Sequence, residues 1–566
     1  AISQGIAIGR AFVFRKAGSY TGNITGNCKT EISVETDKFS KAVENAAAEL
    51  RTLVNTPEAN LTSEEKSILE TQIEFISDEQ LRIDVEAKII SCNIPASEAV
   101  KIAISEMSEM FLATNDNYLI ARISDLRDAG DRITGYLLNR NTNRINVTAE
   151  NTVLIAEEIT PVEAMSIDYR LVSGIVTMKG DKTSHASIII RSKGIPSVSR
   201  FEENIMSVNN NETVIVDGTS GDIIISPDEE TLNIYGNKKK EYDAEAEYLK
   251  SLRSKPAITT DGRKIHLLAN ISCSEEIEFM VKNGGEGVGL LRTELFFMAQ
   301  NEFPSEEKQY GFYVQAAIAA GKKPVSIRTL DIGGDKQLPY FPIPPEDNPF
   351  LGYRAIRISL DRKEIFTTQI RALLRASAYG NIRILLPMIS NIDEIREARA
   401  IISKARADLS QSGISFNNSI ETGIMIEVPS AAIMTDILAN EADFFSIGTN
   451  DLIQYSMAAD RMNSKVAPLY DHFNPGFLRL LETSISQAHK CNKPVGVCGE
   501  MAADPVAAQL LIGMGIDELS VAPAMLPVIK NITLHANYRR AKEICGKVLQ
   551  IDSSNCIREF LKKELI

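Results

Sequence analysis

The sequence has few cysteines and histidines and contains no long apolar segment. Its seven cysteines are scattered without a Cys-x-x-Cys pair, which indicates neither a disulfide framework nor a zinc site. No apolar run approaches the roughly 18 residues needed to span a bilayer, and no signal segment opens the sequence. Acidic residues (75) outnumber lysines and arginines (61), for a net charge of −14. Because such a surface repels nucleic acid and anionic lipid, we expect neither as a partner. The lack of a membrane-spanning run and of a signal segment predicts a cytoplasmic location.

The length of 566 residues predicts three to four domains. A strand-like segment at 5–14 is followed by a helical texture over 36–138, with capping-box spacings at Thr62/Glu65 and Ser77/Gln80. Strand-like runs return at 151–155, 174–177, 213–218 and 222–225. We therefore predict a mixed α/β domain (1–20 and 146–232) with an inserted helical subdomain (21–145). A charged connecting helix follows at 233–254.

The remaining residues, 255–566, alternate short apolar strands with helical stretches. Eight such units in about 300 residues are typical of a (β/α)8 barrel. The predicted strands are 265–270, 287–292, 325–328, 382–388, 423–427, 444–448, 495–498 and 518–521. The predicted fold class is thus multidomain α/β with a C-terminal TIM barrel, whose strand ends would carry the active site.

One of the five histidines, His185, has a context that favours chemistry. It follows the strand-like run 174–177 and the small residues Thr183 and Ser184, and it precedes an apolar stretch that predicts a helix. A histidine at such a turn has a ring nitrogen free for chemistry and backbone N–H groups nearby to bind an anion. His185 is therefore a candidate phosphoryl acceptor, although the pattern alone is more typical of a hydrogen-bonded turn histidine. We interpret the others, His266, His472, His489 and His535, as structural or surface residues.

Several predicted barrel strands end at residues able to bind an anion or a metal. Arg292, Arg328 and Arg461 would present planar guanidinium groups suited to carboxylate and phosphate. Glu427 and Asp451 form a hard oxygen pair suited to Mg²⁺. Each of these residues, taken singly, is more typical of a structural salt bridge than of a ligand-binding site. Their joint placement indicates a small, multiply anionic, magnesium-bound phosphate ester as ligand.

Cys498 ends the seventh predicted barrel strand and is followed by Gly499. A lone cysteine is more often a small buried hydrophobe. Its strand-end position and the flanking Gly499 favour instead a chemical role, and an acid that protonates carbon is consistent with that role.

Motifs along the whole chain are similar to those of one family. The chain resembles enzyme I of the bacterial phosphoenolpyruvate-dependent sugar phosphotransferase system, a phosphoenolpyruvate–protein phosphotransferase. The stretches that carry the resemblance are Lys182-Thr183-Ser184-His185, Gly194-Ile195-Pro196, and those at 287–294, 327–336, 348–357, 444–451 and 496–500.

The resemblance implies that phosphoenolpyruvate (PEP) phosphorylates the protein on a histidine, which then passes the group to a small histidine-containing phosphocarrier protein. By position, His185 matches the phosphorylated histidine and Cys498 the acid that protonates the enolate. The resemblance also implies a swivelling phosphohistidine domain, a carrier-binding helical subdomain and a barrel that forms a homodimer. The matching substrate positions are Arg292, Arg328, Arg354, Arg461, Asn450 and Asp451, and the matching Mg²⁺ ligands are Glu427 and Asp451.

The sequence departs from the family pattern near His185. Gly180-Asp181-Lys182 replaces the usual Gly-Gly-Arg, and Ala164 replaces a usual hydroxyl residue. Because Asp181 adds negative charge, we expect slower transfer or a less stable phosphohistidine, as in a specialised paralogue.

Acidic residues between Glu64 and Glu86 would attract a basic carrier surface, although a solvated acidic helix pair explains them as well.

Two other functions compete with the main prediction. Relatives of pyruvate phosphate dikinase or PEP synthase share the histidine domain and barrel, but they need a nucleotide-binding domain that this sequence does not show. A non-enzymatic sensor of PEP would not need the candidate catalytic residues of the barrel, Cys498 among them, which are present in this sequence.

Overall fold

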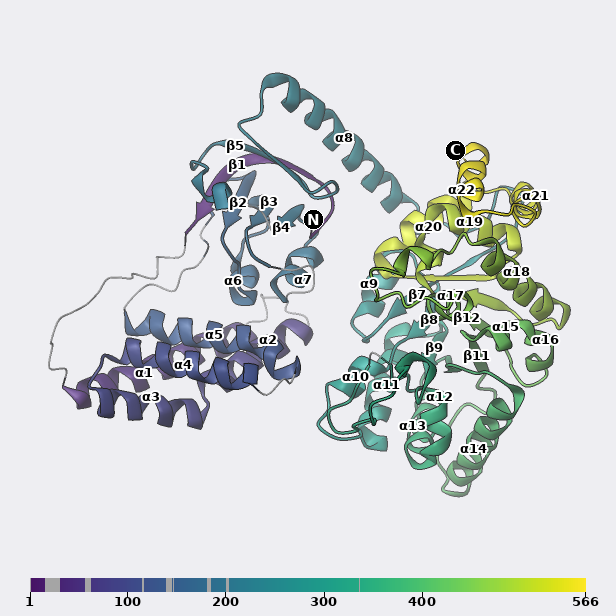
Figure 1. Cartoon of the computed structure of the whole chain (residues 1–566), viewed down its shortest axis with the longest axis horizontal. Helices are drawn as coiled ribbons and strands as arrows, with labels where there is room; N and C mark the ends of the chain where they lie inside the picture. The colour runs from purple at the N-terminus through teal and green to yellow at the C-terminus, as the bar shows by residue number, and fades with distance from the viewer. Residues whose placement is uncertain are drawn as a thin grey trace. The chain divides into compact units, whose positions relative to one another are not determined.

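The computed structural model (Figure 1) describes residues 2–15, 31–55, 63–113, 117–138, 145, 147–180, 185–199, 203–334 and 336–565. The predicted cap residue Thr62 and the departures Asp181 and Lys182 lie outside these ranges. The chain forms two compact units, Ala1–Glu245 and Ala246–Ile566, which are described separately.

A six-stranded sheet organises the first unit. Its order is β4-β3-β2-β1-β5-β6, with parallel pairing from β4 to β1 and antiparallel pairing of β5 with β1 and β6. Leu154 and Ile175 pack on one face while Val153 and Val176 pack on the other, because successive strand residues point to opposite faces. The strands are β1 (Ile6–Phe14), β2 (Thr152–Ala156), β3 (Val172–Thr177), β4 (Ser197–Ser199), β5 (Thr213–Asp217) and β6 (Asp222–Ile225). Only β4 was not predicted, since three residues are too few to show an alternation.

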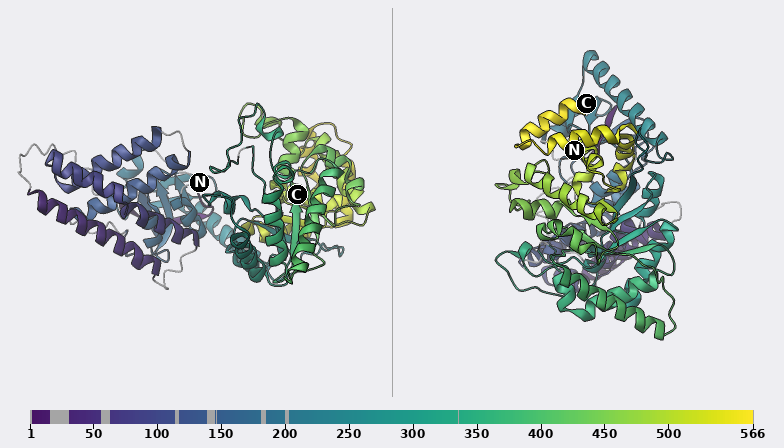
Figure 2. Two further views of the ribbon diagram at one scale, coloured as in Figure 1. Left: turned by 90° about the horizontal axis from the view of Figure 1, so that it is seen from below. Right: turned by 90° about the vertical axis from the view of Figure 1, so that its right-hand side faces the viewer.

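Five helices are inserted between β1 and β2, as the helical texture predicts, and they lie side by side as a bundle (Figures 1 and 2). Their bounds are α1 (Ile32–Asn55), α2 (Ser63–Ile76), α3 (Glu79–Cys92), α4 (Ala96–Ala113) and α5 (Asn117–Leu137). The predicted cap at Ser77 is wrong: Asp78 caps α3, and its carboxylate accepts from the Leu81 amide at 2.8 Å. Asp78 lies one residue closer to the helix than Ser77, so its carboxylate reaches the Leu81 amide directly.

Two short helices, α6 (Pro161–Ser166) and α7 (His185–Ser192), pack against one face of the sheet. A capping box starts α6: the Glu163 amide donates to the Thr160 hydroxyl, and the Thr160 amide donates to the Glu163 carboxylate. Ala164, where the sequence departs from the family pattern, is fully buried in α6. A charged helix, α8 (Glu229–Ser251), contains no buried residue, as its composition predicts.

The second unit contains a closed barrel of eight parallel strands with helices around it (Figures 1 and 2), which confirms the predicted fold class. The barrel closes where β14 pairs with β7. The strands are β7 (His266–Ile271), β8 (Gly287–Leu291), β9 (Val325–Arg328), β10 (Ile382–Leu386), β11 (Thr422–Ile426), β12 (Phe445–Ile447), β13 (Val495–Val497) and β14 (Glu518–Val521). Every predicted barrel strand is present, with ends shifted by at most two residues.

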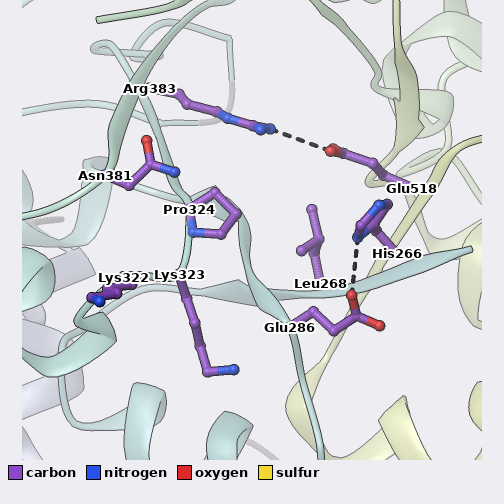
Figure 3. Close-up of a pocket in the computed structure, with 9 residues that line it drawn as sticks. All are labelled: His266, Leu268, Glu286, Lys322, Lys323, Pro324, Asn381, Arg383 and Glu518. Atoms are coloured by element: carbon purple, nitrogen blue, oxygen red, sulfur yellow. Dashed lines mark hydrogen bonds and ion pairs between the residues drawn. The ribbon is translucent and has the colours of Figure 1, made fainter. Parts of the chain in front are cut away.

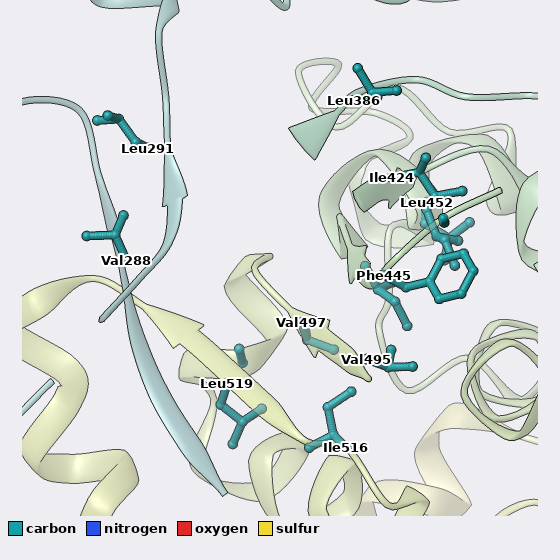
Figure 4. Packing of buried hydrophobic residues seen from close by; sticks show 14 of the residues in the cluster. Val288, Leu291, Leu386, Ile424, Phe445, Leu452, Val495, Val497, Ile516 and Leu519 are labelled. Carbon is teal, nitrogen blue, oxygen red and sulfur yellow. The ribbon is translucent and has the colours of Figure 1, made fainter. Parts of the chain in front are cut away.

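Aliphatic side chains fill the space between barrel and helices, as Figure 4 shows for Leu386, Val497 and Leu519. The helices are α9 (Glu276–Lys282), α10 (Glu294–Met298), α11 (Glu306–Ala320), α12 (Ile356–Asp361), α13 (Lys363–Ala376), α14 (Ile392–Gln411), α15 (Pro429–Ile433), α16 (Thr435–Leu438), α17 (Thr449–Met457), α18 (Pro475–Lys490), α19 (Pro505–Met514), α20 (Leu526–His535), α21 (Tyr538–Val548) and α22 (Ser554–Glu564). Among the helices of the described part of the chain, none is both long and apolar enough to cross a membrane.

Candidate active site

The carboxyl ends of the barrel strands bring most of the predicted site residues to one mouth of the barrel. Arg328 ends β9, Glu427 follows β11, Asp451 lies in the first turn of α17 after β12, and Cys498 follows β13. All four side chains are buried. Parallel strands place their carboxyl ends at the same face, so the folding of the barrel itself assembles this group.

A buried network of charges surrounds Arg328. Its Nη2 contacts Glu294 and lies 3.0 Å from an Asp331 oxygen. Lys336 joins the same two carboxylates, at 3.0 Å from Glu294 and 2.8 Å from Asp331. Burial lowers the pKa of Arg328, but the charges of Asp331 and Glu294 outweigh it and raise the pKa overall. The guanidinium group is therefore a permanent cation held in a fixed orientation.

Arg354 extends the network towards α17. Its Nη2 lies 3.1 Å from Asp331 and 3.4 Å from Asp451, and its Nη1 donates to the Tyr455 hydroxyl at 2.9 Å. Asp331 thus bridges Arg328 and Arg354. Although burial alone raises the pKa of Asp331, the charges of Arg328, Lys336 and Arg354 lower it far below the usual range. Two guanidinium groups held side by side can bind a ligand with several anionic oxygens.

Glu427 and Asp451 are two buried carboxyl groups that lie near the guanidinium groups of Arg328 and Arg354, respectively. Burial, then the charges of Asp451 and Asp331, raise the pKa of Glu427 to about 8. Its Oε2 accepts from the Met388 amide at 2.8 Å. The buried Oδ1 of Asp451 has no hydrogen-bond partner among the described residues. An unpartnered carboxylate oxygen beside a second desolvated carboxylate fits a hard divalent cation. Within the described part of the chain, no three Asp, Glu, His or Cys side chains gather as a complete metal site.

Three backbone positions around this mouth have a positive φ that non-glycine residues rarely adopt. They are Ala355 (51°), Met388 (55°) and Ala458 (50°). Ala355 follows Arg354, the Met388 amide donates to Glu427, and Ala458 is the C-cap residue that follows α17. Such strain costs about 1–3 kcal/mol per residue and gathers at functional sites, where the surrounding structure maintains it.

Cys498 lies just below this charged layer. Its amide donates to the Ile447 carbonyl at 3.1 Å, and its thiol lies 3.6 Å from the same oxygen. Apolar side chains pack with it inside the barrel, namely Leu290, Leu385, Met425 and Phe444. Burial raises the pKa of Cys498. The thiol therefore retains its proton at neutral pH.

The remaining predicted residues are less tightly held. Arg292 follows β8, is exposed, and makes no ion pair within the described residues. Asn450 accepts a hydrogen bond from the Glu500 amide at 3.0 Å and so contacts the loop that follows Cys498. Arg461 is half-buried beside the Tyr470 hydroxyl. His185 is the first residue of α7, in the other unit, and its side chain is not described.

Sequence reasoning assigned no role to Asp331 and Glu294, which pair with the arginines, or to Lys336, which pairs with both carboxylates. All three lie in stretches that carry the family resemblance. One feature of the sequence could have indicated the contact between Asp331 and Arg328: Asp331 follows Arg328 by three residues at the end of a strand.

A cavity of about 390 Å³ lies at the opposite mouth of the barrel (Figure 3). His266 and Glu518, the first residues of β7 and β14, line it. His266 pairs with Glu286 at 2.9 Å and Arg383 with Glu518 at 3.2 Å. These ion pairs link barrel strands and are separate from the charged layer around Arg328.

Comparison with known proteins places the whole chain in one family. Three family models match: the PEP-utilising enzyme N-terminal domain (residues 1–122), mobile domain (148–221) and PEP-binding domain (246–538). The phosphoenolpyruvate-protein phosphotransferase of Priestia megaterium is 38% identical, over 99% of this chain and 98% of that protein. Those of Bacillus subtilis (38%) and Staphylococcus carnosus (36%) align over 99% and 100% of this chain, and over 98% of each relative. The chain therefore belongs to the phosphoenolpyruvate–protein phosphotransferase family of PEP-utilising enzymes.

Proposed function

We propose that the chain transfers the phosphoryl group of PEP to its own His185 and then to a histidine-containing phosphocarrier protein, as the first step of sugar uptake. The observation that carries this proposal is the buried network at the barrel mouth. Arg328 and Arg354 are fixed there by Asp331, 3.0 and 3.1 Å away, next to the protonated thiol of Cys498. Family membership over nearly the full chain supports the same reaction.

Arginines would hold both ends of PEP. Arg328 and Arg354 would supply oriented, permanent charge from the buried layer, while exposed Arg292 and half-buried Arg461 would close over the ligand. A guanidinium fork binds two oxygens at once, which suits a ligand that carries both carboxylate and phosphate. Asn450 and Asp451 would complete the polar lining.

Glu427 and Asp451 would hold Mg²⁺. Bound there, the ion would neutralise charge that develops on the phosphoryl and enolate oxygens. The unpartnered Asp451 oxygen and the desolvated Glu427 carboxylate support this assignment.

In the reaction, a ring nitrogen of His185 attacks phosphorus while the bond between phosphorus and the enol oxygen breaks. The arginines stabilise the enolate that remains. The Cys498 thiol donates its proton to the methylene carbon, giving pyruvate, and the thiolate later regains a proton from water. Burial of Cys498 keeps the thiol protonated for this step.

His185 has two partners, so we propose that its domain (1–20 and 146–232) moves between them. The helical subdomain (21–145) would dock the carrier. The connector, predicted from the sequence at 233–254, would be formed by α8 (Glu229–Ser251). The barrel (255–566) would bind PEP and form a homodimer. Exposed apolar residues on α15 and α16, Ile433 (59% exposed) and Ile437 (44%), support a protein contact there.

The test is pyruvate release from PEP with the purified full chain, Mg²⁺ and carrier. We expect one pyruvate per chain without carrier, one further pyruvate for each carrier molecule supplied, and loss of both on addition of EDTA. ATP-dependent phosphorylation of pyruvate would instead favour a dikinase-like enzyme. PEP binding without pyruvate release would favour a non-enzymatic sensor.

A further inference from the structure

The carbonyl group of Cys498 needs a hydrogen-bond donor that its own strand does not provide. The ladder between β13 and β14 contains only the pairs Gly496↔Glu518 and Val497↔Leu519, and it ends before Cys498. On the other side, the Cys498 amide is bonded to Ile447 at the end of β12. A buried carbonyl without a donor would cost about 1–3 kcal/mol and leave the residue free to shift.

Asn270, on β7, supplies the missing donor from two strands away. Its Nδ2 donates to the Cys498 carbonyl at 2.9 Å and to the Ser520 carbonyl on β14 at 3.1 Å. The Asn270 side chain thus links the end of β7 to the end of β14 and to the segment after β13. The backbone of Cys498 is therefore fixed from both sides, by Ile447 and by Asn270.

Ser520 sets the orientation of the Asn270 amide. Its hydroxyl donates to Asn270 Oδ1 at 2.7 Å, which turns Nδ2 towards Cys498. The register between β7 and β8 shifts between Ala269 and Asn270, which leaves Gly289 as the extra residue of a bulge. A Cβ atom at Gly289 would lie only 2.4 Å from the Ser520 hydroxyl oxygen. The glycine bulge therefore makes the space in which Ser520 orients Asn270.

We propose that Asn270, oriented by Ser520, is the positioning residue that aims the Cys498 thiol at the methylene carbon of the enolate. This inference rests on the proposed function, in which Cys498 is the acid. Asn270 acts through the backbone of Cys498, so its loss should slow proton transfer and leave PEP binding intact. Misplacing a reacting group by about 1 Å can cost on the order of 100-fold in rate.

The experiment uses the full chain with Asn270→Leu, which keeps the volume and removes both donated bonds, and with Ser520→Ala, which removes only the orienting bond. Proton transfer at carbon is followed directly by Mg²⁺-dependent exchange of pyruvate methyl protons in D₂O, measured by proton NMR. We expect exchange and kcat to fall about 10- to 100-fold in Asn270→Leu and less in Ser520→Ala, with KM for PEP within about twofold. Asn283→Leu is the control, since Asn283 is buried and donates to the Phe279 carbonyl at 3.1 Å, remote from Cys498.

Wild-type exchange in both variants, while Cys498→Ala is inactive, would overturn the positioning role and leave the proposed function intact. A raised KM with unchanged kcat would show a merely structural role and overturn the inference as well. Exchange that survives in Cys498→Ala would remove the acid role of Cys498, and the positioning role with it. If Asn270→Leu does not fold, Ser520→Ala alone tests the inference: a reduced exchange rate supports the positioning role, and a wild-type rate overturns it.

Discussion

Asp331 accepts a hydrogen bond over 3.1 Å from Nη2 of Arg354, and the two side chains are only 1% and 2% exposed. The same carboxylate contacts Arg328 and Lys336. One buried anion therefore contacts three cations.

Asp331→Asn should both weaken PEP binding and destabilise the barrel. Removing one member of a buried charge pair leaves an uncompensated charge and costs about 3–5 kcal/mol. We expect a lower free energy of unfolding in urea and a raised KM for PEP. Asp552→Asn, at an exposed position in the same unit, should change stability by no more than about 0.5 kcal/mol. Equal stability of the two variants would contradict the account of Asp331.

Cys498→Ala should bind PEP normally and lose turnover by roughly 10²- to 10⁴-fold, because the arginines remain while the acid is gone. Binding is measured by titration and turnover by pyruvate release. Cys545→Ala is the matched control, since Cys545 in α21 is equally buried at 4% exposure. If both variants lost turnover alike, packing and not acid chemistry would explain the effect.

Carrier binding should depend on the exposed acids of α2 and α3. Glu70 and Glu74 lie on α2 and Glu79 begins α3, and all three are exposed. Their replacement by Gln should slow association with the carrier about tenfold at low salt and flatten its salt dependence, because exposed charges act mainly on encounter. The control replaces three exposed acids of α8, Glu230, Glu241 and Glu245. Equal effects of the two sets would indicate net charge, not a docking surface.

Barrel stability should fall at acidic pH through Asp517. Burial raises the pKa of Asp517, but hydrogen bonds from His489 and the Val495 amide, with the charge of Arg263, lower it overall. A carboxyl group with a depressed folded pKa stabilises the protein above its unfolded pKa of about 3.9, and this stability is lost as pH falls through the folded pKa. Asp517→Asn should therefore show a smaller loss of unfolding free energy below about pH 4 than wild type. An unchanged pH profile in this variant would exclude Asp517 as the cause.

The sequence predicted the framework well because barrel strands are short apolar runs bounded by turn residues, and such runs are readable without tertiary contacts. It did not predict β4, which is too short. It also did not predict the N-cap at Asp78, because either Ser77 or Asp78 could cap α3. It placed Arg328, Glu427, Asp451 and Cys498 at strand ends, and the structure brings them to one mouth.

The contacts among these residues could not be predicted in the same way. Asp331 bridges Arg328 to Arg354, 26 positions later in the sequence, and Asn270 reaches Cys498 across two strands. Such contacts depend on barrel closure and on local irregularities such as the bulge at Gly289. They leave no periodic pattern in the sequence.

The central claim, that His185 is the phosphoryl acceptor, is tested most directly by mapping the label after brief incubation of the full chain with ³²P-labelled PEP and Mg²⁺. Peptide analysis under alkaline conditions, which preserve phosphohistidine, should place one acid-labile phosphoryl group on the peptide that contains His185. His185→Ala should remain unlabelled while still binding PEP. Label on another residue, or full labelling of His185→Ala, would contradict the account.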